Sequence, residues 1–140
     1  MSAKKRGPRK PAVREVERVR HLLSLDAARA VRRLEAKHEE AVSLFSRLRT
    51  REALVELCRS DFTSASFTAL SKLEPKEQAS TAAFHDALFE LRWYVSYTED
   101  MPSAVKVTVT QYVRKLSELH RVLSATLGPP EALGHRVIEG

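Results

Sequence analysis

The sequence contains few of the residues that crosslink or interrupt a fold. Cys58 is its only cysteine, which excludes an internal disulfide and favours a reducing compartment. Four glycines and six prolines are too few for a loop-rich β fold. No stretch approaches the roughly 20 apolar residues of a membrane span, and no apolar run follows the charged N-terminus. We therefore expect an intracellular chain without a signal peptide or membrane span.

The net charge is confined to the N-terminal end. The first twenty residues hold eight basic and two acidic side chains, a balance of +6, which is also the formal net charge of the whole chain. Residues 21–140 therefore carry equal numbers of acidic and basic side chains. Clustered Lys and Arg gain by displacing counterions from closely spaced phosphates or carboxylates. The pattern predicts a neutral body whose cationic end contacts a polyanion, and it leaves the identity of that polyanion open.

At 140 residues the chain fits one domain with two terminal extensions. Residues 1–11 combine two prolines and a glycine with five basic side chains, so we expect a disordered basic arm. Residues 12–127 are the predicted helical domain. Residues 128–140 begin with the helix-breaking run Gly-Pro-Pro and are expected to form a flexible C-terminal tail.

Apolar residues recur with helical spacing through the domain. A first long helix is predicted from residue 12 to about Arg49, because no Pro or Gly interrupts the pattern there. The Ser- and Thr-rich segment 58–74 predicts a short connector helix. Pro75 suits the first turn of a second long helix, and Ser103 suits the N-cap of a third. We predict an all-α fold, with a long N-terminal amphipathic helix, a connector helix and two further helices in a helical bundle or coiled-coil-like arrangement.

The first helix carries a heptad-type seam. Its apolar positions are spaced seven apart, with others four residues after some of them. Such a seam predicts helix pairing, within this chain, with a second copy or with a partner protein. The candidate helix-pairing interface consists of Leu34, Ala41, Phe45 and Leu48.

The basic residues of the arm and of the first helical turns are the candidate polyanion-binding residues. They are Lys4, Lys5, Arg6, Arg9, Lys10, Arg14 and Arg18. The run from Lys4 to Lys10 has the charge density of a nuclear-import or phosphate-binding segment, although a solvated tail that keeps the protein soluble has the same composition. In the alternative interpretation this cationic face continues along the helix through Arg29, Arg32 and Arg33 and binds nucleic acid.

No combination of residues predicts catalysis, a metal or a cofactor. Cys58 lies in an apolar helical stretch, where a cysteine is usually a packing residue. Glu35 and His38 have the spacing of one half of a di-iron site, but no second such motif accompanies them. The five histidines show no metal-ligand spacing with Cys58.

Aromatic residues gather near the end of the second long helix. Helical spacing places Trp93 and Tyr97 on one side, and such side chains commonly anchor protein interfaces. We take both as candidate partner anchors, with a core cluster closing the bundle end as the alternative. The predicted function is a non-enzymatic assembly or adaptor subunit, favoured in the nucleus over the cytoplasm, with a protein partner and a polyanion and no small-molecule substrate. The alternative is a nucleic-acid-binding module.

Overall fold

The computed structural model describes the backbone of residues 2–128 and the side chains of residues 14–128 other than Thr63 and Ser64. Over this part of the chain it has five α-helices, one 3₁₀ helix and no strand, so the predicted all-α fold is confirmed. The elements are α1 (Ser2–Leu48), α2 (Glu52–Leu57), η1 (Asp61–Ser64), α3 (Phe67–Leu70), α4 (Pro75–Tyr97) and α5 (Pro102–Leu127). The predicted C-terminal tail, apart from Gly128, lies outside the described residues.

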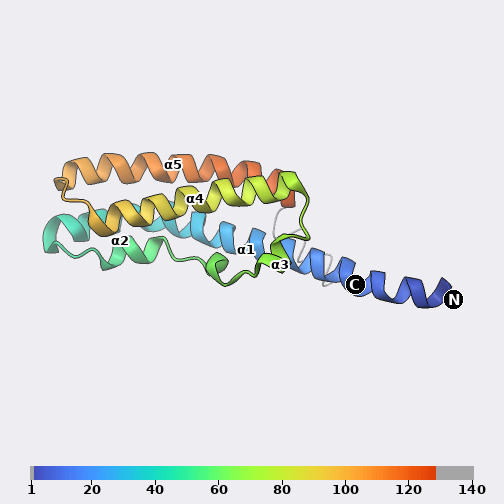
Figure 1. Ribbon diagram of the computed structural model, residues 1–140. Coiled ribbons are helices and arrows are strands. Elements are labelled where there is room, and N and C mark those ends of the chain that lie inside the picture. Colours follow the sequence, from blue (N-terminus) through green and yellow to red (C-terminus); the bar gives the residue numbers. More distant parts are fainter. Residues whose placement is uncertain (1, 129–140) are drawn as a thin grey trace.

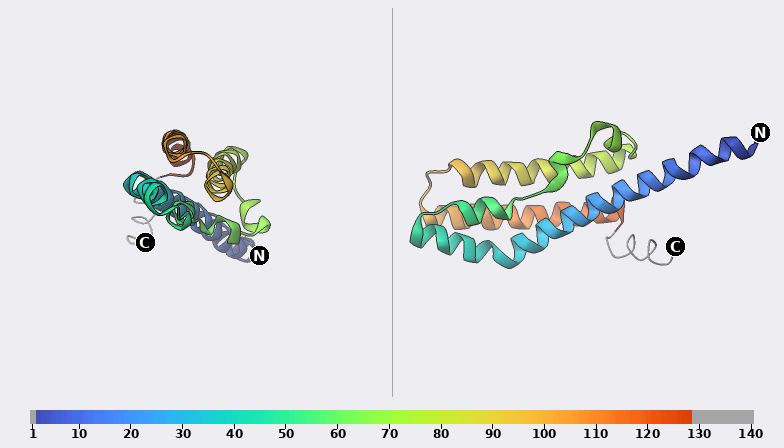
Figure 2. Two further views of the ribbon diagram at one scale, coloured as in Figure 1. Left: turned by 90° about the vertical axis from the view of Figure 1, so that its left-hand side faces the viewer. Right: turned by 90° about the horizontal axis from the view of Figure 1, so that it is seen from below.

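Three long helices form the bundle. Helices α1 and α4 both pack against α5, which runs antiparallel to them, and the short α2 packs against α1 and α4 (Figures 1 and 2). Helix α1 has 47 residues and α5 has 26. At 1.5 Å per residue these lengths are roughly 70 Å and 40 Å. The N-terminal part of α1 therefore projects beyond the bundle (Figures 1 and 2).

Helix α1 begins at Ser2, inside the segment predicted to be a disordered arm. Its backbone stays helical through Gly7 and Pro8, two residue types of low helix propensity. The side chains of this segment are not among the described ones, so disorder of the arm in solution stays a prediction. The other end of α1 falls within one residue of the predicted one, because Arg49 adopts a left-handed backbone conformation (φ 57°) that stops the helix.

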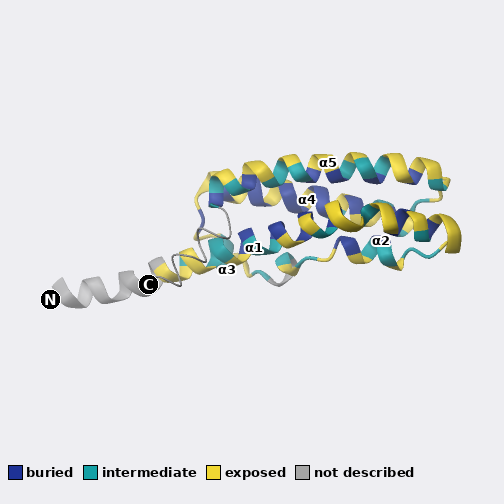
Figure 3. Ribbon diagram, turned by 180° about the vertical axis from the view of Figure 1, so that it is seen from behind, coloured by how far each residue is buried: buried dark blue, intermediate teal, exposed yellow. Residues whose placement is uncertain are grey.

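The core lies between the apolar stripes that the sequence predicts, and Figure 3 shows buried positions turned toward neighbouring helices. In α4 the stripe is fully buried. It consists of Phe84, Leu88, Leu91 and Val95. In α5 four of the six apolar positions with helical spacing are buried, and Tyr112 and Leu119 pack against the core from its edge. The six positions are Val105, Val109, Tyr112, Leu116, Leu119 and Leu123. The periodicity therefore located the core of both helices correctly.

Polar side chains fix the relative positions of the helices. Arg20 of α1 donates two hydrogen bonds to the Glu77 carboxylate of α4, at 2.6 and 3.1 Å. Burial opposes ionisation of Glu77, but the bonds from Arg20 and from the Glu74 backbone N–H outweigh it and lower the pKa of Glu77. At the far end of α5, the Ser24 hydroxyl donates to the Gly128 carbonyl at 2.8 Å.

Two helix starts contain proline, and one of them corrects a prediction. Pro75 opens α4 as predicted. The predicted N-cap of α5 at Ser103 is wrong: Met101 occupies that position and Pro102 opens the helix. Proline fits the first helical turn because it lacks the backbone N–H that would be unsatisfied there, so Pro102 starts α5 without a side-chain cap.

Candidate functional site

The outer face of α4 presents exposed aromatic rings. Residues 86, 90, 93 and 97 are four, three and four positions apart, so they share one face of the helix. The buried stripe of α4 occupies the opposite face. Trp93 is 69% exposed and Tyr97 66% exposed, with ring centroids 4.5 Å apart. The alternative in which both rings close the core is therefore wrong, because the core stripe already fills the inner face of α4.

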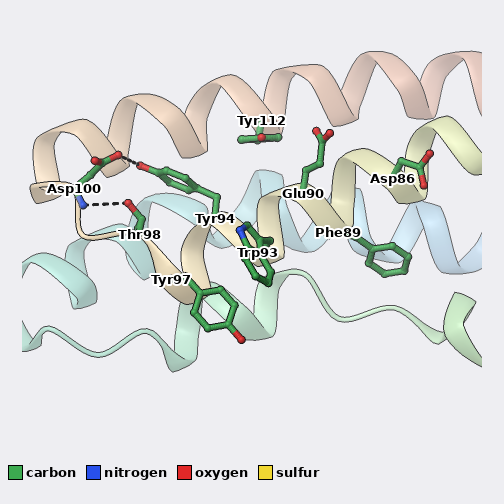
Figure 4. A pocket seen from close by; sticks show the side chains of 9 residues that line it. All are labelled: Asp86, Phe89, Glu90, Trp93, Tyr94, Tyr97, Thr98, Asp100 and Tyr112. Carbon is green, nitrogen blue, oxygen red and sulfur yellow. Dashed lines mark hydrogen bonds between the residues drawn. The ribbon is translucent and has the colours of Figure 1, made fainter.

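A shallow hollow of about 920 Å³ lies over this face (Figure 4). Its walls come from α4, from the turn after it and from α5. The lining residues are Asp86, Phe89, Glu90, Trp93, Tyr94, Tyr97, Thr98, Asp100 and Tyr112. The Tyr94 hydroxyl donates to the Asp100 carboxylate at 2.7 Å, and the Asp100 backbone N–H donates to Thr98 Oγ1 at 3.1 Å. These bonds hold the turn at one end of the hollow.

Arg51 binds the backbone at the C-terminal end of α4. Its guanidinium donates to the Val95 carbonyl at 3.1 Å and to the Thr98 carbonyl at 2.5 Å, and it lies 5.4 Å from the centre of the Phe45 ring. Carbonyls of the last helical turn have no partner within the helix, so an arginine satisfies them well. The exposed Trp93 and Tyr97 rings therefore lie near a helix end whose backbone carbonyls are bound by a side chain of the same bundle.

The predicted polyanion-binding residues fall into two groups. Lys4, Lys5, Arg6, Arg9 and Lys10 lie on the projecting helix, outside the described side chains. Arg14 and Arg18 are exposed. Nearby Glu15 forms an ion pair with Lys72, whose hydrogen bond lowers the pKa of Glu15, so the paired lysine offsets its negative charge.

The arginines further along α1 divide between surface and structure. Arg29 and Arg32 are exposed, and Arg29 is eleven residues, about three turns, from Arg18. Arg33 instead donates to the Leu57 carbonyl at 3.2 Å and to the Arg59 carbonyl, beyond the end of α2. Burial lowers the pKa of Arg33. The prediction that Arg33 belongs to the cationic face is therefore wrong, because its guanidinium closes the end of α2.

The predicted helix-pairing interface is mostly internal. Leu34, Ala41 and Phe45 are buried in the core of the bundle, where α1 meets helices of the same chain. Leu48 is 65% exposed at the last position of α1. The seam predicted correctly that α1 pairs. The interpretation in which these residues meet another chain is wrong for the buried three, because their own bundle covers them.

A polar cluster that was not predicted from the sequence lies between α1, α4 and the connector. The Asp26 carboxylate accepts from the Ser60 hydroxyl at 2.6 Å, from the Asp61 backbone N–H at 2.9 Å and from His85 Nε2 at 3.3 Å. His85 is fully buried, its Nδ1 lies 2.9 Å from the Thr81 carbonyl, and Phe62 stacks on its ring at 3.9 Å. A carboxylate on the apolar stripe of α1 was the available signal. The cluster joins α1, α4 and the connector.

The remaining candidates for chemistry have structural surroundings. His38 Nδ1 lies 2.8 Å from the Leu34 carbonyl, a contact within its own helix. Among the side chains that the structure describes, no group of three or more His, Cys, Asp or Glu residues is arranged to hold a metal ion. No helix in the described part of the chain is both long enough and apolar enough to span a bilayer.

Cys58 is a packing residue at the end of α2, as predicted. It is buried, its thiol lies 3.7 Å from the Leu54 carbonyl, and burial raises its pKa to about 12. Because the thiolate is the reactive form, we expect iodoacetamide to modify the native chain roughly a hundredfold more slowly than the urea-unfolded chain, as followed by intact mass. Equal rates in the two states would contradict this assignment.

A third exposed aromatic residue was not predicted from the sequence. Phe67 of α3 is 91% exposed, at the edge of a hollow of about 240 Å³ that Phe62, Leu70 and Leu73 also line. It lies in the Ser- and Thr-rich connector, whose composition gave no periodic signal.

These features define the class of the protein: an all-α bundle with a projecting N-terminal helix and an exposed aromatic face. No protein-family model, curated protein or solved structure matches the chain.

Proposed function

We propose that this protein is a non-enzymatic α-helical adaptor. It binds a partner protein through the outer face of α4 and contacts a polyanion through the basic N-terminal end of α1. The observation that carries the proposal is the division of charge. The first twenty residues hold the entire net charge of +6, and the rest of the chain is balanced.

The projecting helix supports the polyanion contact. A cationic segment that stands clear of a neutral bundle approaches a large polyanion without bringing the acidic side chains of the bundle near it. Arg14 and Arg18 are exposed one turn apart. Glu15 is paired with Lys72, which reduces the repulsion that a phosphate would meet there.

The exposed rings support the protein contact. Trp93 and Tyr97 offer large apolar area at small rotamer cost, and such residues often supply most of the binding energy of an interface. Because the inner face of α4 is packed in the core, a partner does not have to order this helix when it binds.

The polyanion contact is tested by charge reversal on α1. The variant Arg14→Glu/Arg18→Glu should weaken binding of a fluorescently labelled DNA duplex at least about tenfold at 0.15 M salt. The slope of the logarithm of the binding constant against the logarithm of the salt concentration should also become shallower, by about one for each removed cation that touches a phosphate. Fluorescence anisotropy over a salt series measures both quantities. The matched control is Arg47→Glu/Arg114→Glu, which makes the same charge change at exposed positions elsewhere in the bundle.

The control should bind the duplex nearly as well as the unchanged chain. Equal weakening in both double variants would mean that overall charge, and no defined end of the molecule, governs binding. Retention of full affinity by the Arg14→Glu/Arg18→Glu variant and by a chain lacking residues 2–11 would also refute the proposed polyanion contact.

A nucleic-acid-binding module is the second candidate function. Exposure of Arg14, Arg18 and Arg29 along one stretch of α1 favours it. Duplex DNA and polyglutamate at equal charge concentration distinguish the two candidates. An adaptor that reads charge alone binds both, whereas a nucleic-acid module prefers DNA. The proposal includes a nuclear location, supported by the density of basic residues between Lys4 and Lys10.

A further inference from the structure

Acidic side chains surround the exposed rings of α4. Asp86 and Glu90 precede Trp93 and Tyr97 on the same helical face, and all four line the hollow. Asp100 closes the hollow at the turn after α4. In Figure 4 these three carboxylates are spread along the hollow. Tyr94 lies between Asp100 and Glu90, and the Trp93 and Tyr97 rings lie on the lower side of α4 in this view. The face thus combines aromatic surface with negative charge.

Within the described part of the chain, few cations compensate these carboxylates. Lys115 Nζ of α5 lies 3.8 Å from the Glu90 carboxylate, with both side chains more than half exposed, so solvent screens the pair strongly. Arg92 precedes Trp93 in sequence, but helical spacing places it off the face that residues 86, 90, 93 and 97 share, and it does not line the hollow. Arg51 is engaged with the carbonyls of Val95 and Thr98. Among the described residues that line the hollow, none is a Lys or an Arg.

This combination favours a cationic occupant. A lysine ammonium or arginine guanidinium is attracted to the faces of Trp and Tyr rings, and nearby carboxylates add charge-assisted hydrogen bonds. A nucleic acid, which also stacks on aromatic rings, would bring phosphates close to three carboxylates and be repelled. A purely apolar helix would have to desolvate the same carboxylates without partners.

We propose that the outer face of α4 binds a lysine- or arginine-rich peptide segment of a partner protein. The inference rests on the proposed adaptor function and gives its protein partner a chemistry. The segment lies along α4, with cationic side chains against Trp93 and Tyr97 and between Asp86, Glu90 and Asp100. The two ends of the adaptor therefore select opposite charges: the N-terminal end of α1 takes a polyanion and α4 takes a polycation.

The only tryptophan of the chain reports directly on this site. The probe is a synthetic peptide in which lysine and arginine alternate with glycine and serine. Titration into the full chain at low salt should change Trp93 emission in a saturable way, and the affinity should fall at least about tenfold between 0.05 and 0.5 M salt. A peptide with glutamate in place of each cation is expected to leave the emission unchanged.

Two variants and a matched control locate the contact. Asp86→Asn/Glu90→Gln and Tyr97→Ala should each weaken peptide binding about tenfold or more, as measured by anisotropy of a labelled peptide. Glu39→Gln/Glu40→Gln removes the same charge at exposed positions on α1 and should bind as the unchanged chain does. All of these positions are exposed, so circular dichroism should show unchanged helix content and melting.

Three results would overturn the inference. The first is constant Trp93 emission with the basic peptide. The second is equal weakening in the α4 variants and in the α1 control. The third is a full chain that associates at low salt while a chain of residues 12–140 remains monomeric, because the face would then hold the arm of a second copy. The Arg14→Glu/Arg18→Glu variant should still bind the peptide. The peptide experiment and the DNA experiment can therefore fail independently of each other, so a failed polyanion contact is distinguishable from a failed peptide contact.

Discussion

Replacing Leu34 by alanine should lower the free energy of unfolding by about 2–5 kcal/mol, while Leu48→Ala should change it by less than about 0.5 kcal/mol. Leu34 is 1% exposed in the core, so its truncation leaves a cavity that neighbouring side chains fill only in part. Leu48 ends α1 at the surface, where most of its side chain already meets solvent. Urea unfolding followed by circular dichroism measures both values.

The two variants control for each other because the chemical change is identical. The dependence of the unfolding free energy on urea should be the same in both, which would show that the compactness of neither state has changed. Light scattering should give one solution mass for both variants and the unchanged chain. Equal destabilisation of the two variants, or a lower mass in either, would indicate that the seam pairs between chains after all.

The contrast between these leucines shows how far periodicity predicts a fold. Heptad spacing treats Leu34 and Leu48 alike, and it correctly marks α1 as a pairing helix. It carries no information on where a helix stops, and the left-handed Arg49 ends α1 beside Leu48. It also cannot tell which helix supplies the partner. That choice depends on contacts between residues distant in sequence, here with α2 and α5 of the same chain.

The candidate site was predicted in part for the same reason. Spacing alone predicted that Trp93 and Tyr97 lie on one side of a helix. The same spacing places Asp86 and Glu90 on that side as well. The structural roles of Arg33 and Arg51 could not be predicted from the sequence, because each donates hydrogen bonds to carbonyls of a segment distant in sequence. Local sequence predicts a helical face, but only the assembled bundle decides whether an arginine on it meets solvent or a helix end.

Asp26→Ala should destabilise the protein by about 2–3 kcal/mol at neutral pH, because its carboxylate accepts three hydrogen bonds that no other group replaces. The substitution leaves the Ser60 hydroxyl, the Asp61 N–H and the fully buried His85 ring without this acceptor. Urea unfolding of the variant and the unchanged chain gives the difference. Asp86→Ala, on the exposed face of α4, is the control and should shift the value by less than about 0.5 kcal/mol.

The effect of Asp26 should depend on pH in a defined direction. Partial burial tends to raise the pKa of Asp26, but the hydrogen bonds from His85, Ser60 and Asp61 outweigh it and hold the pKa below the ordinary 3.8. Since the folded pKa is the lower one, the folded state favours the ionised carboxyl. This contribution is present above the unfolded pKa and is lost as the pH falls through the folded pKa.

Stability measured from pH 7 to about pH 2 tests this linkage. The difference between the unchanged chain and Asp26→Ala should stay constant down to about pH 4 and then shrink as the carboxyl takes up a proton. Asp26→Asn keeps one oxygen that accepts from Ser60 or Asp61, so it should be less destabilising at neutral pH while losing the same acid dependence. A difference that stays constant across the whole range would mean that Asp26 stabilises the bundle by packing, without its charge. The Asp26 cluster joins α1, α4 and the connector. The Asp26→Ala substitution should therefore also weaken the packing of α4, whose outer face carries Trp93 and Tyr97.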